Sequence, residues 1–246
     1  MTKFAVSKGD AMRFVVAAVI ALGVALFCTK AVKNAPLALY ACAFLADIAY
    51  TYAINFGVSG GIWAVFLPLM QRCTLAMAFF AIVMFTGTLR DASPLKSKLM
   101  PIRRQLSITA SILALCHVVF YANTYIMQIA GIVNGSTAQP ALAANLFVSL
   151  AISLLITALL VVLTATSFIT VKSRMHAATW KKVQRFAYAF YALVFAHLAF
   201  ILAPPALAGK EAAAESMCVY VVVFTVYAIL RIRRFAIDRN AMHRAA

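Results

Sequence analysis

The chain has 246 residues, of which 65% are hydrophobic and only 11% are charged, and its mean hydropathy is +0.95. A soluble domain cannot bury so much apolar surface, so the composition excludes a soluble globular protein and indicates an integral membrane protein. The formal net charge of +16 is explained by basic cytoplasmic loops between membrane helices, and no nucleic-acid partner is expected.

Seven apolar segments are long enough to cross a membrane as helices, for which about 20 residues are needed. The sequence lacks the ten-residue alternating patterns of β-barrel strands, so the expected fold class is all-α, an integral membrane helical bundle of about seven transmembrane helices. The five cysteines lack CxxC spacing and are expected to be packed thiols. The predicted spans are residues 12–30, 36–57, 66–89, 105–129, 142–170, 180–203 and 216–232.

Basic residues gather in three segments that are separated by even numbers of predicted spans, with five Lys or Arg in each. The connection at residues 58–65 carries no charge. The positive-inside rule therefore places the three basic segments in the cytoplasm and, with seven spans, the N-terminus outside. The basic residues are Arg90, Lys96, Lys98, Arg103 and Arg104; Lys172, Arg174, Lys181, Lys182 and Arg185; and Arg231, Arg233, Arg234, Arg239 and Arg244.

Two of the four histidines, His117 and His197, fall within predicted spans. His117 lies 13 residues beyond Arg104, and His197 lies 12 residues beyond Arg185. At about 1.5 Å per residue, each is about 18–20 Å from the inner edge, which is the outer half of a hydrocarbon core about 30 Å thick. Two imidazoles at matched depth on parallel helices fit the two axial positions of a haem iron.

Other roles for the two histidines remain open at this point. A single histidine in a membrane helix can simply bond a Ser, a Thr or a carbonyl of a neighbouring helix. A proton relay or a transport site is a further alternative, because Asp47 and Arg72 also lie in apolar segments and ionisable residues within the membrane mark functional sites.

Four sequence segments carry a resemblance to a known family. The chain resembles the ferric-reductase-like transmembrane superfamily and is most similar to its YedZ/MsrQ branch, which comprises haem-binding membrane subunits of bacterial oxidoreductases. The resemblance spans residues 66–234 and implies a six-helix haem-binding core there, with the helix at 36–57 as an addition. The N-terminal helices would then occupy residues 1–65, and a basic cytoplasmic tail residues 235–246. The segments are MFTGTLR (84–90), PIRRQLSITASILALCHVVFY (101–121), LTATSF (163–168) and WKKVQRFAYAFYALVFAHLAF (180–200).

The resemblance implies which residues hold haem. Two helices of this superfamily each carry an inner and an outer ligand position, 13 to 14 residues apart. His117 and His197 match the outer pair, whereas Arg103 and Gln184 stand at the inner positions. One haem b on the outer side is therefore expected, with His117 and His197 as its iron ligands. Gln184 marks an inner position that lacks histidine.

The implied function is transfer of electrons across the cytoplasmic (inner) membrane of a prokaryote by a multi-pass b-type haem protein. Electrons would come from a cytoplasmic flavoprotein or reductase, or from the quinone pool, and would pass to an extracytoplasmic redox partner. A flavin (FMN or FAD) or a quinone would relay them at the inner side. The chain has no fused nicotinamide-binding domain, so it is expected to be an electron-transfer subunit of an oxidoreductase and not a complete NAD(P)H oxidase. The rival function is a non-redox transporter or scaffold that uses His117 and His197 for structure or proton relay.

Four arginines are candidates for anion contacts at these sites. Arg103, Arg104 and Arg185 are candidates for binding a flavin phosphate or a haem propionate near the inner surface. Arg72 is a candidate partner for a propionate of the outer haem. The alternative for the first three is contact with anionic lipid and control of topology, and Arg72 can instead extend to the outer interface.

Overall fold

The computed structural model describes residues 10–135 and 140–245, and this part of the chain is helical with short turns and no strand. Residues 1–9 of the predicted N-terminal segment, residues 136–139 and the last residue of the predicted tail lie outside the described residues. The prediction of an all-α fold is confirmed for the described part. The helices are α1 (Asp10–Phe27), α2 (Thr29–Asn34), α3 (Pro36–Asn55), α4 (Trp63–Gln71), α5 (Thr74–Thr86), α6 (Pro94–Leu99), a 3₁₀ turn (Met100–Ile102), α7 (Arg103–Leu113), α8 (Leu115–Val133), α9 (Pro140–Ala165), α10 (Ile169–Lys172), α11 (Ala177–Leu207) and α12 (Glu211–Ala245).

The bundle is that of a multi-pass membrane protein whose outer helix faces contact lipid. Within the described residues, five helical stretches are long and apolar enough to cross a membrane, and the count rises to six if α4 and α5 together form one bent span. The apolar helix Met12–Phe27 is shorter than these. The predicted count of seven is therefore reached only if both α1 and the bent pair cross.

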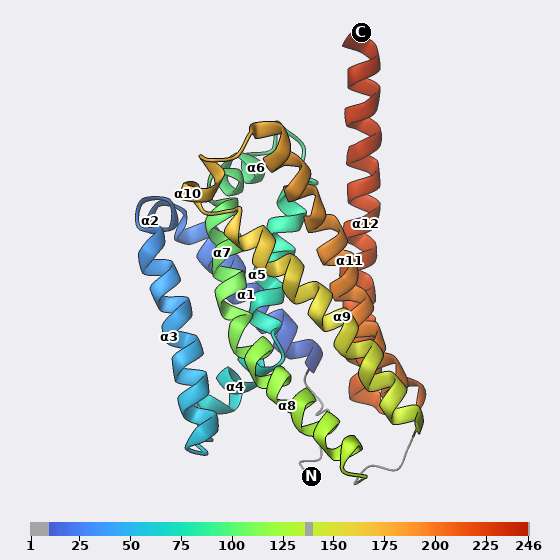
Figure 1. Cartoon of the computed structure of the whole chain (residues 1–246). Helices are drawn as coiled ribbons and strands as arrows, with labels where there is room; N and C mark the ends of the chain where they lie inside the picture. Colours follow the sequence, from blue (N-terminus) through green and yellow to red (C-terminus); the bar gives the residue numbers. More distant parts are fainter. Residues whose placement is uncertain (1–9, 136–139, 246) are drawn as a thin grey trace.

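Helix α5 lies at the centre of the bundle and the other long helices surround it (Figure 1). Ten of its thirteen residues are buried, as expected for a helix that is apolar on all sides. It packs chiefly against α1 and α7, while α3 lies at one edge against α7. Helix α11 packs between α9 and α12. His117 lies on α8 and His197 on α11, and both of these helices contact α9.

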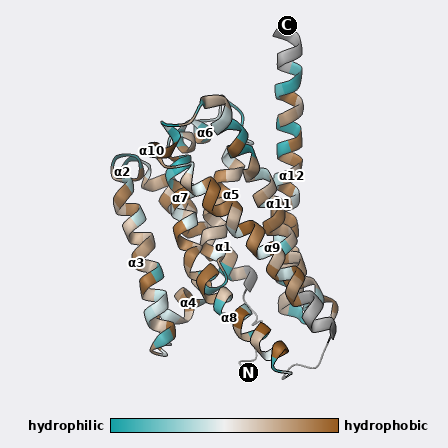
Figure 2. Cartoon of the chain, viewed as in Figure 1, coloured by the Kyte–Doolittle hydropathy of each residue, from teal (hydrophilic) through white to brown (hydrophobic). Residues whose placement is uncertain are grey.

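The basic segments gather at one end of the bundle. Helices α6 and α10 lie at the upper end of the bundle in Figure 1, and the C-terminal end of α12 projects beyond the bundle in the same direction. Figure 2 shows hydrophilic colouring at this end and along the end of α12, whereas the body of the bundle is hydrophobic. This common location is what the charge pattern predicts for segments on one side of a membrane.

The predicted span at 66–89 corresponds to a bent pair of helices, which the apolar pattern alone did not indicate. Helix α4 ends at Gln71, α5 begins at Thr74, and the two helices are bent by 60°. Cys73 connects them in the left-handed conformation with φ of 58°, and its N–H bonds the carbonyl of Met70 at 3.0 Å. Such a φ is uncommon for any residue other than glycine, so tertiary packing holds this turn.

Asp91 ties α12 to the connection between α5 and α6. Its carboxylate accepts hydrogen bonds from Lys96 Nζ at 2.7 Å and from Arg234, and both cations also bond the carbonyl of Leu89. These two cations, Arg234 first, lower the pKa of Asp91 to about 2. Because the pKa is below its ordinary value, the stabilisation is fully present above the ordinary titration range of an aspartate and is lost as the pH falls toward 2.

We expect Asp91→Asn to loosen the C-terminal part of α12, because it removes the only anion shared by Arg234 and the α5–α6 connection among the described residues. The measurement is amide hydrogen exchange over residues 231–240 at neutral pH, where protection should fall. Asp238→Asn is the matched control, since it removes only an i,i+4 pair within α12. Equal protection in Asp91→Asn and the wild type would contradict the role of this tie.

Candidate functional site

His117 lies in the first turn of α8 and is held by the end of α4. Its Nδ1 is 2.7 Å from the carbonyl oxygen of Gln71, the last residue of α4 before the break. A carbonyl only accepts hydrogen bonds, so Nδ1 carries the proton and Nε2 bears the free lone pair. The imidazole packs beside the ring of Tyr121 at 4.6 Å between centroids. The break in the helix therefore sets both the tautomer and the orientation of His117.

His197 lies on α11 and is held by a hydroxyl of α9. Its Nδ1 is 3.3 Å from Ser153 Oγ. The Ser153 hydroxyl donates its hydrogen to the carbonyl of Ser149 at 2.8 Å, so toward His197 its oxygen acts as the acceptor. His197 is therefore also an Nδ1–H tautomer with the lone pair on Nε2.

The structure brings the two histidines into one region of the bundle. His117 and His197 are half-buried, on different helices, and close enough for a charge on one to act on the other. Neither Nε2 has a hydrogen-bond partner among the described residues. A ligand histidine whose Nδ1–H is held by a carbonyl or hydroxyl while Nε2 is free is the usual arrangement of metal-binding imidazoles.

This donor set fits a haem better than a bare metal ion. A haem iron needs only two axial donors from the protein, and two Nε2 atoms are free. Among the described residues, no group of three or more His, Cys, Asp and Glu side chains could hold a metal ion. His117 and His197 therefore offer two imidazole donors, the number that a haem iron requires.

A row of hydroxyls on α9 connects the helices on either side of it. Ser149 Oγ is 2.6 Å from Tyr125 Oη of α8, and Thr164 Oγ1 bonds Ser111 Oγ of α7 at 2.7 Å. Ser153 of the same row contacts His197. These supporting residues were missed from the sequence, although Ser149 and Ser153 recur at the four-residue spacing of one helix face.

The side chains at the two inner positions, Arg103 and Gln184, form hydrogen bonds with other residues of the protein. Arg103 Nε bonds the carbonyl of Val83 at 2.9 Å, and Gln184 Nε2 bonds Thr166 Oγ1 at 2.9 Å. Trp180 Nε1 bonds the carbonyl of Thr166 at 3.0 Å. Neither a guanidinium nor an amide nitrogen engaged in this way offers a lone pair to iron.

A cationic cluster at the inner end of the bundle includes residues that sequence analysis missed. Arg103 lies within electrostatic range of Arg231, Tyr188 and Tyr227, and the guanidinium of Arg231 lies 4.7 Å from the centre of the Tyr188 ring. The hydroxyl of Tyr227 is buried without a hydrogen-bond partner in the described part of the chain. Arg231 and Tyr227 come from α12, far from Arg103 in sequence, so no local pattern indicates that they meet.

The remaining predicted arginines fall in different environments. Arg104 and Arg185 are exposed, whereas Arg72 is half-buried at the α4–α5 break, within electrostatic range of Tyr121. Because Tyr121 packs against His117, Arg72 is the predicted anion-binding arginine nearest to the histidine pair. The structure does not bring Arg104 or Arg185 to that pair.

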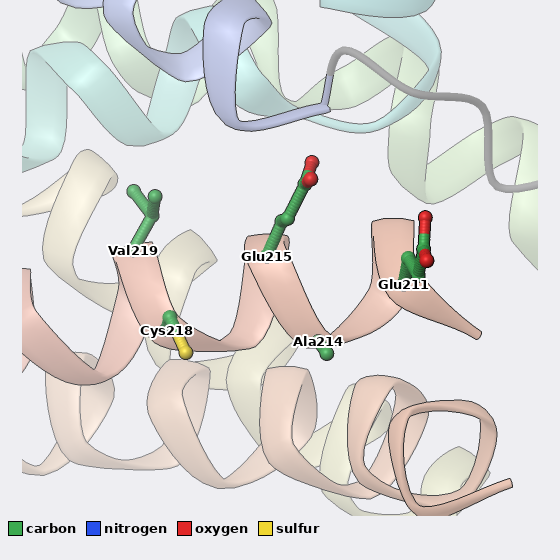
Figure 3. Close-up of a pocket in the computed structure, with 5 residues that line it drawn as sticks. All are labelled: Glu211, Ala214, Glu215, Cys218 and Val219. Carbon is green, nitrogen blue, oxygen red and sulfur yellow. The ribbon is translucent and has the colours of Figure 1, made fainter. Parts of the chain in front are cut away.

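A separate surface depression lies on α12. The described residues that line it come from the first three turns of that helix, and Figure 3 shows Glu211 and Glu215 on one side and Cys218 on the other. It contains neither histidine of the pair, and its acidic residues are not converged on one point. The lining residues are Glu211, Ala214, Glu215, Cys218 and Val219.

Comparison with known proteins finds a bacterial relative. The chain is 38% identical over 180 residues to an uncharacterised protein of Treponema pallidum (strain Nichols), and the alignment covers 73% of this chain and 47% of that protein. The chain therefore spans about half the length of this relative. No family model matches the chain.

The left-handed turn at Cys73 supports the site, because it presents the carbonyl of Gln71 to His117. Cys73→Val should lower the free energy of unfolding by about 1–2 kcal/mol relative to Cys73→Gly, since glycine adopts a left-handed conformation without strain. The measurement is chemical denaturation in detergent, followed by tryptophan fluorescence.

Cys42 provides the matched control for this comparison, because it is an exposed cysteine within α3 with ordinary helical backbone. There the order should reverse, with Cys42→Gly less stable than Cys42→Val, since glycine weakens a helix interior. The same order at both cysteines would show that the turn at Cys73 is not strained.

Proposed function

We propose that this protein transfers electrons across a bacterial cytoplasmic membrane by means of one b-type haem between α8 and α11, with His117 and His197 as the axial ligands. The observation that carries the proposal is the matched state of the two imidazoles. Each has its Nδ1–H held by a protein acceptor, and each leaves Nε2 free. Two such donors on different helices suit one iron with both axial positions filled.

The proposed topology has seven crossings, in which α1 crosses once and α4 and α5 together form one bent crossing. The basic ends of α6, α10 and α12 then face the cytoplasm, in accordance with the positive-inside rule. The histidine pair lies toward the opposite side, in the outer half of the membrane. This arrangement leaves a gap between the cytoplasm and the haem that a second carrier must bridge.

A haem iron with two histidine ligands supplies one-electron transfer and disfavours oxygen binding. The residues of this chain contribute the fixed imidazole orientations. Arg72 contributes positive charge near Tyr121 that would favour a propionate on this side.

The inner relay is proposed to be a flavin or a quinone at the cationic cluster of Arg103, Arg231 and Tyr227. Two guanidinium groups and an unpartnered phenol offer donors for a phosphate or for a quinone oxygen. The exposed Arg104 and Arg185 are better placed for anionic lipid or for an acidic cytoplasmic donor protein. The electron donor is a cytoplasmic flavoprotein or a quinol, and the acceptor is an extracytoplasmic redox protein.

The proposed relationship is to the YedZ/MsrQ branch of the ferric-reductase-like superfamily, with residues 66–234 as the haem-binding core. Its support is the order of the motifs along α5, α7, α8, α9 and α11. The absence of a ligand at Gln184 and Arg103 makes this a one-haem variant. The chain would act as a subunit that accepts electrons from a separate reductase.

A non-redox transporter or scaffold is a second candidate, favoured by the broken helix beside His117. Discontinuous membrane helices form substrate and ion sites in many transporters, because their ends expose free backbone groups. In that case His117 and His197 serve structure or proton relay. The two candidates differ in colour, since only the first binds haem.

Purified protein made with ample haem supply should show a Soret band and sharp α and β bands on reduction. His117→Ala and His197→Ala should each abolish the low-spin spectrum, because each removes one of two axial donors. His176→Ala is the control, since this histidine is exposed in the connection before α11, and its spectrum should match the wild type. A colourless wild-type preparation would overturn the redox proposal, and two haems per chain would show that Arg103 or Gln184 was misjudged.

Ser153→Ala tests the hydroxyl that holds His197. Loss of such a supporting partner typically costs about 10–100-fold in affinity of the metal group, so haem should bind with weaker affinity but with an unchanged low-spin spectrum. Thr157→Ala is the matched control, because Thr157 lies one turn further along α9 and bonds only the carbonyl of Ser153. Haem titration of the apo-protein measures both, and equal affinities would contradict the role of Ser153.

A further inference from the structure

Helix α3 turns one narrow face toward the bundle, and a carboxylate lies at its centre. Ala43, Asp47, Tyr50 and Ala53 are buried, whereas most of α3 faces outward. Asp47 is only 7% exposed, and neither of its carboxylate oxygens has a hydrogen-bond partner among the described residues. An ionisable residue within a membrane helix indicates a functional site.

The surroundings of Asp47 contain thiols but no basic side chain that acts on it within the described part of the chain. The Cys116 thiol of α8 is its nearest weak donor, although the pair does not reach the geometry of a normal hydrogen bond, and Cys73 at the α4–α5 break lies within electrostatic range. The Tyr50 hydroxyl, one turn further along α3, is also buried and unpartnered, and it faces Cys116 and Tyr121. A bare carboxylate in such a place is strongly unfavourable, so something must neutralise it.

The chemistry of the neighbours decides what neutralises Asp47. Thiols are poor ligands for sodium, calcium or magnesium, which prefer oxygen. Soft metals prefer thiolates, but no convergent set of three such donors exists in the described residues. A proton requires no coordination shell and only one acceptor for the O–H group. We propose that Asp47 is a proton-binding site within the membrane, protonated at neutral pH and able to exchange its proton at the α4–α5 break.

The break provides the means of exchange. A discontinuous membrane helix exposes backbone groups that a continuous helix would satisfy internally. Cys116 Sγ lies 3.8 Å from the carbonyl of Met70 and 3.4 Å from that of Leu113, so this thiol connects the vicinity of Asp47 to the end of α4. The titratable groups that act on Asp47 are Cys73 at the break and Cys116 on α8. Tyr50 on α3 faces Cys116 and Tyr121. Arg72 at the break and His117 on α8 are neighbours of Tyr121 and do not act on Asp47.

The assignment does not depend on whether the chain binds haem, and its test uses the full chain as purified. An apolar carbodiimide reacts with a protonated carboxyl group in a membrane: the carboxyl oxygen adds to the central carbon, and the acidic hydrogen moves to nitrogen. Peptide mapping by mass spectrometry should therefore find the adduct on Asp47 at neutral pH. Labelling should decrease as the pH rises, and sodium chloride at constant pH should leave it unchanged. Asp91 should remain unlabelled, because its carboxylate is ionised and paired with Lys96 and Arg234.

Infrared spectroscopy provides a second measurement that needs no reagent access. The wild type should show the carbonyl stretch of a protonated carboxyl group, shifted in D₂O, and Asp47→Asn should lack this band. Glu215→Gln, on α12, is the control and should retain it. Absence of the band from the wild type would overturn the proposal. Protection of Asp47 from the carbodiimide by sodium would also overturn it, because a metal cation would then be the ligand.

Discussion

The hydrogen bond between His117 Nδ1 and the carbonyl of Gln71 is the contact on which the candidate site depends. A membrane offers no water to satisfy the end of a helix, so a break within a span persists only where side chains satisfy the exposed backbone groups. The imidazole satisfies the last carbonyl of α4, and the carbonyl fixes the tautomer of the imidazole. The imidazole of His117 and the carbonyl of Gln71 therefore stabilise each other. The cost of this arrangement is backbone strain at Cys73, which adopts the left-handed conformation.

The two histidines are supported unequally. His117 is held at 2.7 Å by a backbone carbonyl, whose position is set by the bundle, whereas His197 is held at 3.3 Å by a serine hydroxyl. A hydroxyl can rotate to suit its partner, so the α11 side of the site tolerates more adjustment. The row of hydroxyls on α9 fits this difference, since it bridges α8 and α11 by side chains alone.

Sequence alone predicted the parts of the structure that depend on local composition. Each of the seven apolar segments predicted as a span corresponds to a helix or a pair of helices in the structure. The distribution of Lys and Arg correctly indicated which end of the bundle is hydrophilic. The turn at Cys73 was not predictable, because Pro68 is the one helix-breaking residue nearby and the chain continues as a helix for three residues beyond it. Ser153 and Arg231 were missed for a related reason: their roles come from helices that meet only in the folded bundle.

The role expected from the sequence and the position found in the structure differ most for helix α3. The resemblance implies that the helix at 36–57 is an addition to a six-helix core, and the sequence does not indicate which residues surround Asp47. In the structure α3 packs against α7, α4 and α8, and the Tyr50 ring meets Phe120 of α8 at 6.4 Å between centroids. The face that carries Asp47 thus approaches the same break that holds His117. The α4–α5 break therefore lies near both His117, which a backbone carbonyl orients, and Asp47, whose carboxyl group needs a proton. Helix α3 thus contributes a candidate functional residue to the bundle and is more than an addition at its edge.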